Sequence, residues 1–159
     1  MRHLIGADDI LEALKLLTRF QDQVDVILGL NLKESTEIAD VLGLPGRGDA
    51  EGTIEENAKA IREKLGLSCV VIHPRRGAAA ATEHHSARFA GPFVQQPKIS
   101  TGAGDHFNAG FCLGTLLGFS LEESLCTGVA TSGYYVREAE SPTALQLADF
   151  IDHLPPPQA

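Results

Sequence analysis

A glycine-rich stretch followed by an apolar helical pattern constrains this chain more than any other feature. Residues 99–105 read Ile-Ser-Thr-Gly-Ala-Gly-Asp, and residues 106–117 continue with the apolar spacing of a helix. A glycine turn that opens a helix exposes backbone N–H groups without intrahelical partners, and the positive end of the helix dipole lies beside them. The stretch therefore predicts an anion-binding helix start. Asp105 in that turn is placed to accept a proton from an attacking hydroxyl group, which suggests phosphoryl transfer.

The residues from Gly102 to Asp105 also allow a purely structural interpretation, since glycine turns and capping aspartates occur at ordinary loop-to-helix junctions. The wider context favours function. The stretch resembles the second signature of the ribokinase-like (PfkB) carbohydrate kinases, Asp-Thr-x-Gly-Ala-Gly-Asp, and residues 106–111 continue the match. This resemblance implies ATP-dependent phosphoryl transfer to a hydroxyl of a sugar, a polyol or a related small alcohol.

Both the resemblance and the chemistry of the residues assign roles within the stretch. Asp105 would be the general base that takes the proton of the acceptor hydroxyl as the γ-phosphoryl group moves. Gly102, Ala103 and Gly104 would form the anion hole for the transferring phosphoryl oxygens. Thr101, which belongs to the same signature, would contact the nucleotide.

The first two positions of the signature depart from the family. Ile99 stands where the family has aspartate, and Ser100 replaces threonine. In the family that first aspartate is linked to activation by a monovalent cation. Its replacement weighs against potassium dependence in this chain, and ATP and Mg²⁺ remain the expected cofactors.

A second polar pair follows the first predicted strand. Asn31 and Glu34 resemble the family's Asn-x-x-Glu motif, which that family uses near magnesium and phosphate. Amide and carboxylate oxygens suit Mg²⁺, which keeps several waters, so Glu34 would hold the ion through water. The same spacing fits a helix start in which Asn31 caps and Glu34 closes a capping box. Both interpretations stay open here.

Two further segments bear on the nucleotide. Residues 72–77 read Ile-His-Pro-Arg-Arg-Gly, where many relatives carry Thr-Leu-Gly-x-x-Gly against the nucleotide. Only Gly77 agrees, and the resemblance assigns it to nucleotide binding, whereas exposed arginines such as Arg75 and Arg76 are usually just solvated. Small residues over 127–133 predict close helix packing, and the resemblance adds that adenine could rest on that helix.

The pattern of elements predicts an α/β fold with a mostly parallel sheet. The resemblance specifies a ribokinase-like three-layer sandwich, and we expect a single domain over residues 1–159 with a short disordered tail from about residue 154. The expected elements are helices over about 7–20, 32–42, 53–64, 105–117, 120–136 and 144–153, buried strands over 24–30 and 68–73, a turn-rich connector over 43–52, and a hairpin or meander over 78–94. Gly66 is expected to stop the third helix, and Ser120 with Glu123 is expected to form a capping box at the start of the fifth.

Composition narrows the class of protein. The net charge of −8 and the pI of about 5.1 weigh against a nucleic-acid partner. No apolar run approaches the ~18 residues of a membrane span, and no signal peptide opens the chain. The three cysteines are odd in number and far apart, so they are read as buried small hydrophobes in a reducing cytoplasm.

Length raises a further expectation, because members of that family are much longer than 159 residues. The resemblance runs from about Leu4 to Leu154 and matches a carboxyl-terminal half, so we expect an incomplete fold that lacks most of the sugar pocket. An uncovered sheet edge would favour a homodimer or association with a missing amino-terminal half. Two alternatives remain: a non-catalytic nucleotide-binding or interaction module, and a vitamin or nucleoside kinase of the same superfamily.

Overall fold

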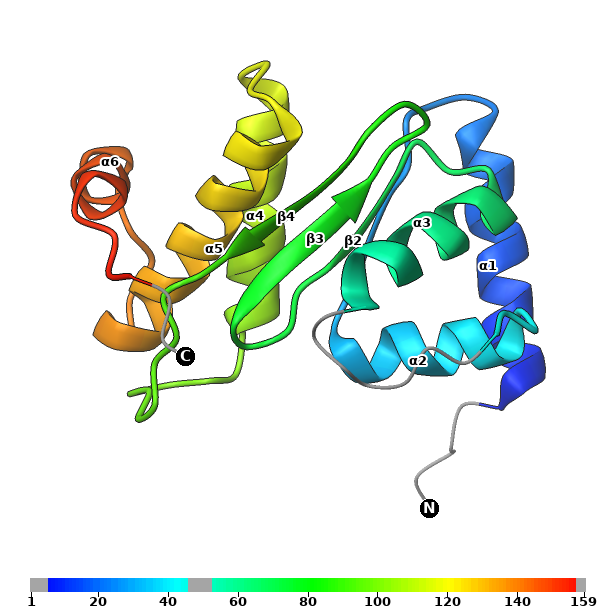
Figure 1. The fold of residues 1–159 in the computed structure, drawn as a ribbon, viewed down its shortest axis with the longest axis horizontal. Helices are drawn as coiled ribbons and strands as arrows, with labels where there is room; N and C mark the ends of the chain where they lie inside the picture. The colour runs from blue at the N-terminus through cyan, green and yellow to red at the C-terminus, as the bar shows by residue number, and fades with distance from the viewer. Residues whose placement is uncertain (1–5, 46–52, 157–159) are drawn as a thin grey trace. The chain divides into compact units, whose positions relative to one another are not determined.

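The structure, a computed structural model, describes residues 6–45 and 53–156. Helices and strands follow one another in the order that the sequence predicts, which confirms the α/β class (Figure 1). The elements are α1 (Ala7–Gln21), β1 (Ile27–Leu30), α2 (Leu32–Val41), α3 (Ile54–Leu65), β2 (Cys69–Ile72), β3 (Gly77–Ala81), β4 (Ser86–Ala90), α4 (Ala103–Leu116), α5 (Leu121–Glu138) and α6 (Ala144–Asp152).

The chain forms two compact units. The first contains the chain up to Ile72 together with Ala80–Ser86, and the second contains His73–Ala79 and the chain from Ala87 onward. The strand order of the sheet is β1-β2-β3-β4. The single domain expected over residues 1–159 stays a prediction, and residues 157–159 of the expected tail lie outside the described residues.

In the first unit, β1 and β2 pair in parallel, with Ile27 opposite Cys69 and Leu30 opposite Ile72. Strand β2 is buried along its whole length, as predicted, but only Leu30 of β1 is buried. The predicted start of β1 at Val24 is wrong. The Val24 N–H donates to the Phe20 carbonyl (3.0 Å), so this residue belongs to the turn that ends α1.

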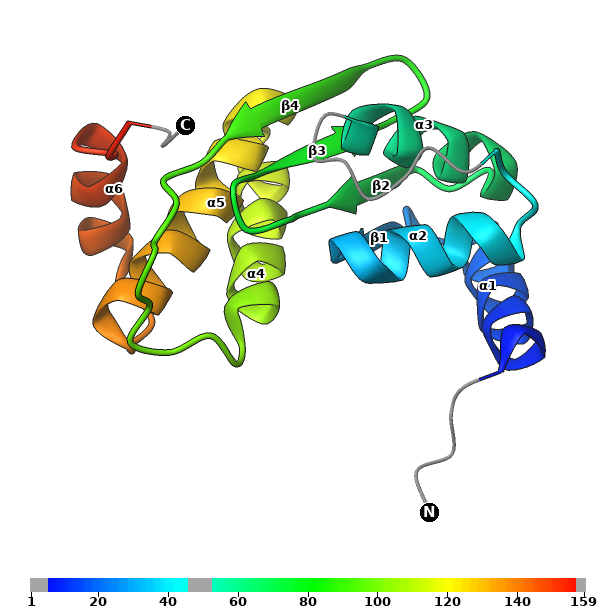
Figure 2. The ribbon, with the colours of Figure 1, turned by 60° about the horizontal axis from the view of Figure 1, so that its bottom comes forward.

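The helices of the first unit pack through their apolar faces. Helix α3 packs against β2 and buries Ile54, Ala58 and Ile61, while α2 contacts both α1 and α3 (Figure 2). Helix α3 ends at Gly66 with φ 65°, a left-handed conformation that favours glycine. The sequence predicted this stop. The connector expected over 43–52 falls largely on residues 46–52, which lie outside the described residues.

In the second unit, α4 and α5 lie side by side and α6 packs on α5 (Figures 1 and 2). Glycines permit the close approach of the first pair. A Cβ atom on Gly114 would lie 2.8 Å from Ser124 Cα, and one on Gly128 would lie 2.9 Å from Phe107 Cε2. The packing interpretation of the small residues over 127–133 is therefore confirmed.

Local signals predict where α5 and α6 begin. Ser120 and Glu123 form the predicted capping box, with the Ser120 N–H donating to Glu123 Oε2 (2.8 Å). Helix α4, however, begins at Ala103, two residues before the predicted start at Asp105. Gly104 and Asp105 consequently lie inside its first turn.

All three cysteines are free thiols. Only Cys69 is buried, so the expectation of burial is wrong for the half-buried Cys112 and Cys126.

None of the helices within residues 6–45 and 53–156 combines the length and the apolar character that crossing a membrane requires.

Candidate functional site

The glycine turn before α4 leaves several backbone donors open. Gly102 caps the helix with φ 88°, a left-handed conformation that costs glycine little. The helix ladder starts with the His106 N–H donating to the Gly102 carbonyl (3.1 Å), and the Ala103 N–H donates to the Ser100 carbonyl (3.2 Å). Within the described part of the chain, the N–H groups of Gly102, Gly104 and Asp105 have no acceptor. The turn therefore presents free amides at the positive end of α4.

Asp105 is exposed in the first turn of α4. Its carboxylate forms no ion pair or hydrogen bond with any residue that the structure describes. Asp105 is thus accessible to a ligand, and its role as a base stays a prediction.

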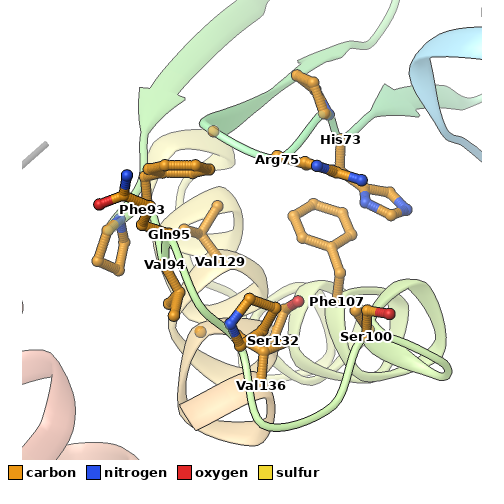
Figure 3. A pocket seen from close by; sticks show the side chains of 16 residues that line it. His73, Arg75, Phe93, Val94, Gln95, Ser100, Phe107, Val129, Ser132 and Val136 are labelled. Carbon is orange, nitrogen blue, oxygen red and sulfur yellow. The ribbon is translucent and has the colours of Figure 1, made fainter. Parts of the chain in front are cut away.

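A pocket of about 410 Å³ adjoins this turn and lies within the second unit (Figure 3). Of the predicted site residues, only Gly77 and Ala103 line it among the residues that the structure describes. The other predicted residues of the glycine turn do not line it: Thr101, Gly102, Gly104 and Asp105. The lining residues are His73, Pro74, Arg75, Gly77, Pro92, Phe93, Val94, Gln95, Pro97, Ser100, Ala103, Phe107, Val129, Ser132, Gly133 and Val136. This mixture of apolar walls with a few polar groups is typical of a small-molecule site.

The walls of the pocket are mainly apolar and aromatic. Figure 3 shows Phe93 and Phe107 on opposite sides, with Val129 of α5 between them. The guanidinium of Arg76 lies over the Phe93 ring, 4.6 Å from its centroid. The expectation that this arginine is merely solvated is wrong. Arg75 is exposed and lines the pocket, where it supplies positive charge.

His73 is a site residue that the sequence interpretation missed. It directly follows β2, and its imidazole stacks on the Phe107 ring with centroids 4.4 Å apart. Its position at the carboxyl end of a buried strand is the signal that points to it, since ligands of open α/β sheets gather there. His106 and Tyr135, which contact the glycine turn, were missed as well, and no local pattern singles out Tyr135.

Asn31 and Glu34 lie in the first unit, where they cap α2. The Asn31 N–H donates to Glu34 Oε2 (2.9 Å), and Asn31 Oδ1 accepts from the Glu34 N–H (2.8 Å). The helix-start interpretation is confirmed, and the nucleotide and magnesium roles stay predictions. Both residues are exposed, and Glu34 Oε1 has no partner among the described residues.

The donor set around Glu34 suits only a hydrated ion. The described ranges hold no group of three or more His, Cys, Asp or Glu side chains that could enclose a metal. One carboxylate oxygen is occupied by the cap, and the other is free toward solvent. Such a group can contact Mg²⁺ through its water shell, because this ion is usually held by one or two carboxylates and substrate phosphates.

Solved structures share this fold over most of the chain. Phosphofructokinase-2 from Escherichia coli in complex with substrates and products matches with a TM-score of 0.69 at 17% identity, over 94% of this chain and 45% of that one. Ribokinase from Arabidopsis thaliana complexed with ribose and ATP matches with a TM-score of 0.66 at 24% identity, over 84% and 43%. These likenesses confirm the ribokinase-like fold.

Sequence comparison gives a narrower result. A ketohexokinase from Haloferax volcanii is 30% identical over 145 residues, which are 91% of this chain and 37% of that protein. The chain thus spans less than half the length of each of these three relatives. The family model described as prokaryotic ketohexokinase matches residues 2–154. With nearly every residue inside that match, and with the fold and glycine turn of the ribokinase-like kinases, this chain belongs to the prokaryotic ketohexokinase family.

Proposed function

We propose that this chain carries the nucleotide-binding and phosphoryl-transfer part of an ATP-dependent sugar kinase, with a ketohexose as acceptor. One observation carries the proposal: the free N–H groups of Gly102 and Gly104 and the exposed carboxylate of Asp105 share one helix turn. Phosphoryl transfer needs an anion hole and a base side by side. The name of the Haloferax volcanii relative supports the acceptor class.

The proposed reaction uses the groups of this turn. The acceptor hydroxyl attacks the γ-phosphorus of ATP and gives its proton to the Asp105 carboxylate. A new O–P bond forms, and the bond from the γ-phosphorus to the β–γ bridging oxygen breaks, so that ADP leaves. The N–H groups of Gly102 and Gly104 donate to the equatorial phosphoryl oxygens, where negative charge is concentrated. The absence of side chains at the two glycines lets those oxygens approach the backbone.

The pocket beside the turn would hold the base of the nucleotide. Its aromatic and aliphatic walls, Phe93 and Val129 among them, suit a flat purine. Arg75 at the pocket would attract the phosphates, with Thr101 and Gly77 on the nucleotide side as the resemblance implies. The Arabidopsis thaliana ribokinase, whose structure contains ribose and ATP, supports ATP as the phosphoryl donor.

Glu34 would hold Mg²⁺ through water, and Asn31 would keep the Glu34 side chain in place through the capping box. When bound, the ion would neutralise charge on the ATP phosphates. We propose that the protein works in the cytoplasm, where its three free cysteines stay reduced.

The test compares wild-type protein with Asp105→Asn. ATP binding is measured by calorimetry, and ADP formation is measured with Mg²⁺ and a panel of ketohexoses, polyols and nucleosides. We expect ATP affinity to change by less than ~2-fold, because asparagine has the same shape. Turnover should fall by about 10²–10⁴-fold, the usual contribution of a general base.

Other outcomes separate the alternatives. Near-normal turnover in Asp105→Asn contradicts the assignment of the base. ATP binding without transfer to any acceptor supports a non-catalytic nucleotide-binding module. Transfer restricted to nucleosides or vitamins supports another kinase class of the superfamily and contradicts the ketohexose acceptor.

A further inference from the structure

We infer that His106 and Tyr135 are positioning residues that hold the glycine turn in its phosphate-accepting conformation. The inference rests on the proposed function, and neither residue is assigned a role by the resemblance. His106 follows Asp105 in the first turns of α4, and Tyr135 lies on α5. Together they bind two consecutive backbone carbonyls of the turn.

His106 holds the carbonyl of Gly102. Its Nδ1 lies 2.8 Å from that oxygen, and because a carbonyl only accepts, Nδ1 carries the proton. In the neutral ring Nε2 then accepts from the hydroxyl of Ser141, at 2.8 Å. Both ring nitrogens are therefore engaged, which fixes the orientation of the imidazole.

Tyr135 holds the neighbouring carbonyl. Its hydroxyl donates to the Thr101 carbonyl at 3.0 Å. The phenol ring stacks flat on the imidazole of His106, with centroids 3.6 Å apart and an angle of 11° between the planes. The two rings thus form one unit that contacts the turn through two hydrogen bonds. A Cβ atom on Gly102 would lie 3.2 Å from the Tyr135 hydroxyl oxygen, so the turn packs directly against it.

Because a peptide unit is planar, a hydrogen bond that holds a carbonyl group also sets the direction of the N–H group that follows it. In a trans peptide the C=O of one residue and the N–H of the next point in opposite directions. A fixed Thr101 carbonyl therefore aims the free Gly102 N–H, and a fixed Gly102 carbonyl keeps the Ala103 N–H on the Ser100 carbonyl (3.2 Å), which braces the turn. Without these bonds, the glycine at φ 88° has other conformations within reach that would turn a carbonyl toward the phosphate. A carbonyl there would repel the anion that the amides attract.

The experiment uses variants that remove one contact each. His106→Phe keeps the ring stack and loses both nitrogens, and Tyr135→Phe keeps the stack and loses the hydroxyl. His106→Asn restores a donor near the place of Nδ1 without the stack. The matched control is Thr115→Ala, which removes an exposed hydroxyl that donates to Phe111 of the same helix (3.0 Å). Thermal melting of each variant reports whether the fold is intact.

Two measurements are made on the full chain. Calorimetry gives the Kd for ATP, and NMR relaxation dispersion of the Gly102 and Ala103 amides reports conformational exchange of the turn. We expect His106→Phe and Tyr135→Phe each to weaken ATP binding by ~10-fold and to introduce exchange at both amides. His106→Asn should stay within ~3-fold of wild type. The Thr115→Ala control should match wild type in both measurements.

The outcomes separate the inference from the proposed function. Unchanged Kd and unchanged amide exchange in both phenylalanine variants overturn the inference. Failure of the wild-type chain to bind ATP overturns the proposed function and the phosphate role of the turn. In that case, conformational exchange of the amides that appears only in the two phenylalanine variants still supports the inference that His106 and Tyr135 hold the turn.

Discussion

The imidazole of His73 lies flat against the ring of Phe107, with centroids 4.4 Å apart and an angle of 18° between the planes. This contact joins the segment after β2 to the first turns of α4. Phe107 is only 1% exposed and also stacks on Phe111, so the contact continues into the core of the second unit. His73 Cε1 lies 3.3 Å from the Cβ position that Gly104 leaves empty. The glycine turn is therefore confined by the chain after β2.

The first prediction is a coupling between Gly104 and His73. In a helix, Gly→Ala ordinarily stabilises by about 0.4–1 kcal/mol through the unfolded state. Gly104→Ala should show none of this gain, because its methyl group meets the imidazole. In a His73→Ala background the gain should return. The free energies of unfolding, measured with urea, should therefore give a coupling of ~1 kcal/mol between the two positions. If the effects of the two substitutions on the free energy of unfolding add within ~0.3 kcal/mol, the imidazole moves aside at no cost and the coupling is contradicted.

The second prediction separates the two roles of Glu34. Glutamine also closes a capping box, so Glu34→Gln should change the free energy of unfolding by less than ~0.5 kcal/mol. Glu34→Ala should cost ~1 kcal/mol, because it breaks the bond to the Asn31 N–H. If Glu34 contacts magnesium, both variants should raise the Mg²⁺ concentration needed for half-maximal ATP binding. An equal Mg²⁺ requirement in wild type and Glu34→Gln would leave only the capping role.

The third prediction concerns the packing of α4 on α5. A methyl group on Gly110 would collide with Thr131 Oγ1 and would lie 2.7 Å from the Thr127 carbonyl oxygen. Overpacking against backbone typically costs about 1–3 kcal/mol, so Gly110→Ala should be destabilised despite its better helix propensity. The control is Ala109→Ser on the exposed neighbouring position, which should stay within ~0.5 kcal/mol of wild type. Equal stability of Gly110→Ala and the control would contradict the packing.

The fourth prediction concerns pH and the end of α6. The His153 ring donates to the Asp149 carbonyl (2.9 Å), and this bond, followed by the charge of the Asp149 carboxylate, raises the pKa of His153 above its ordinary 6.5. The protonated form is thus favoured by folding. Its contribution to stability is fully present below pH 6.5 and is lost as the pH rises through the raised value.

The measurement is the difference in melting temperature between wild type and His153→Gln. This difference should be larger in acidic buffer, below pH 6.5, than in alkaline buffer. Asp149→Asn serves as the control, because it removes the carboxylate and keeps the backbone carbonyl, which is the main cause of the raised pKa of His153. It should reduce the pH dependence only in part. A melting difference that is independent of pH would contradict the role of His153.

Much of the fold could be predicted because its signals are local. The stop at Gly66, the capping box of Ser120 and Glu123, and the buried strand β2 all follow from a few adjacent residues. The early start of α4 was missed, since glycine and alanine give no strong helix signal. The start of β1 was missed for another reason. The apolar Val24 resembles strand, yet its N–H completes the end of α1.

The sequence by itself determined the class of fold, the family and the glycine turn with its aspartate, because periodicity, caps and signatures are carried by neighbouring residues. Only the tertiary structure decided which side chains surround that turn. His106 meets Tyr135, and Phe107 meets His73, because α4 packs closely on α5 and against the segment after β2. These contacts join residues far apart in the chain, and no local pattern encodes the packing that brings them together.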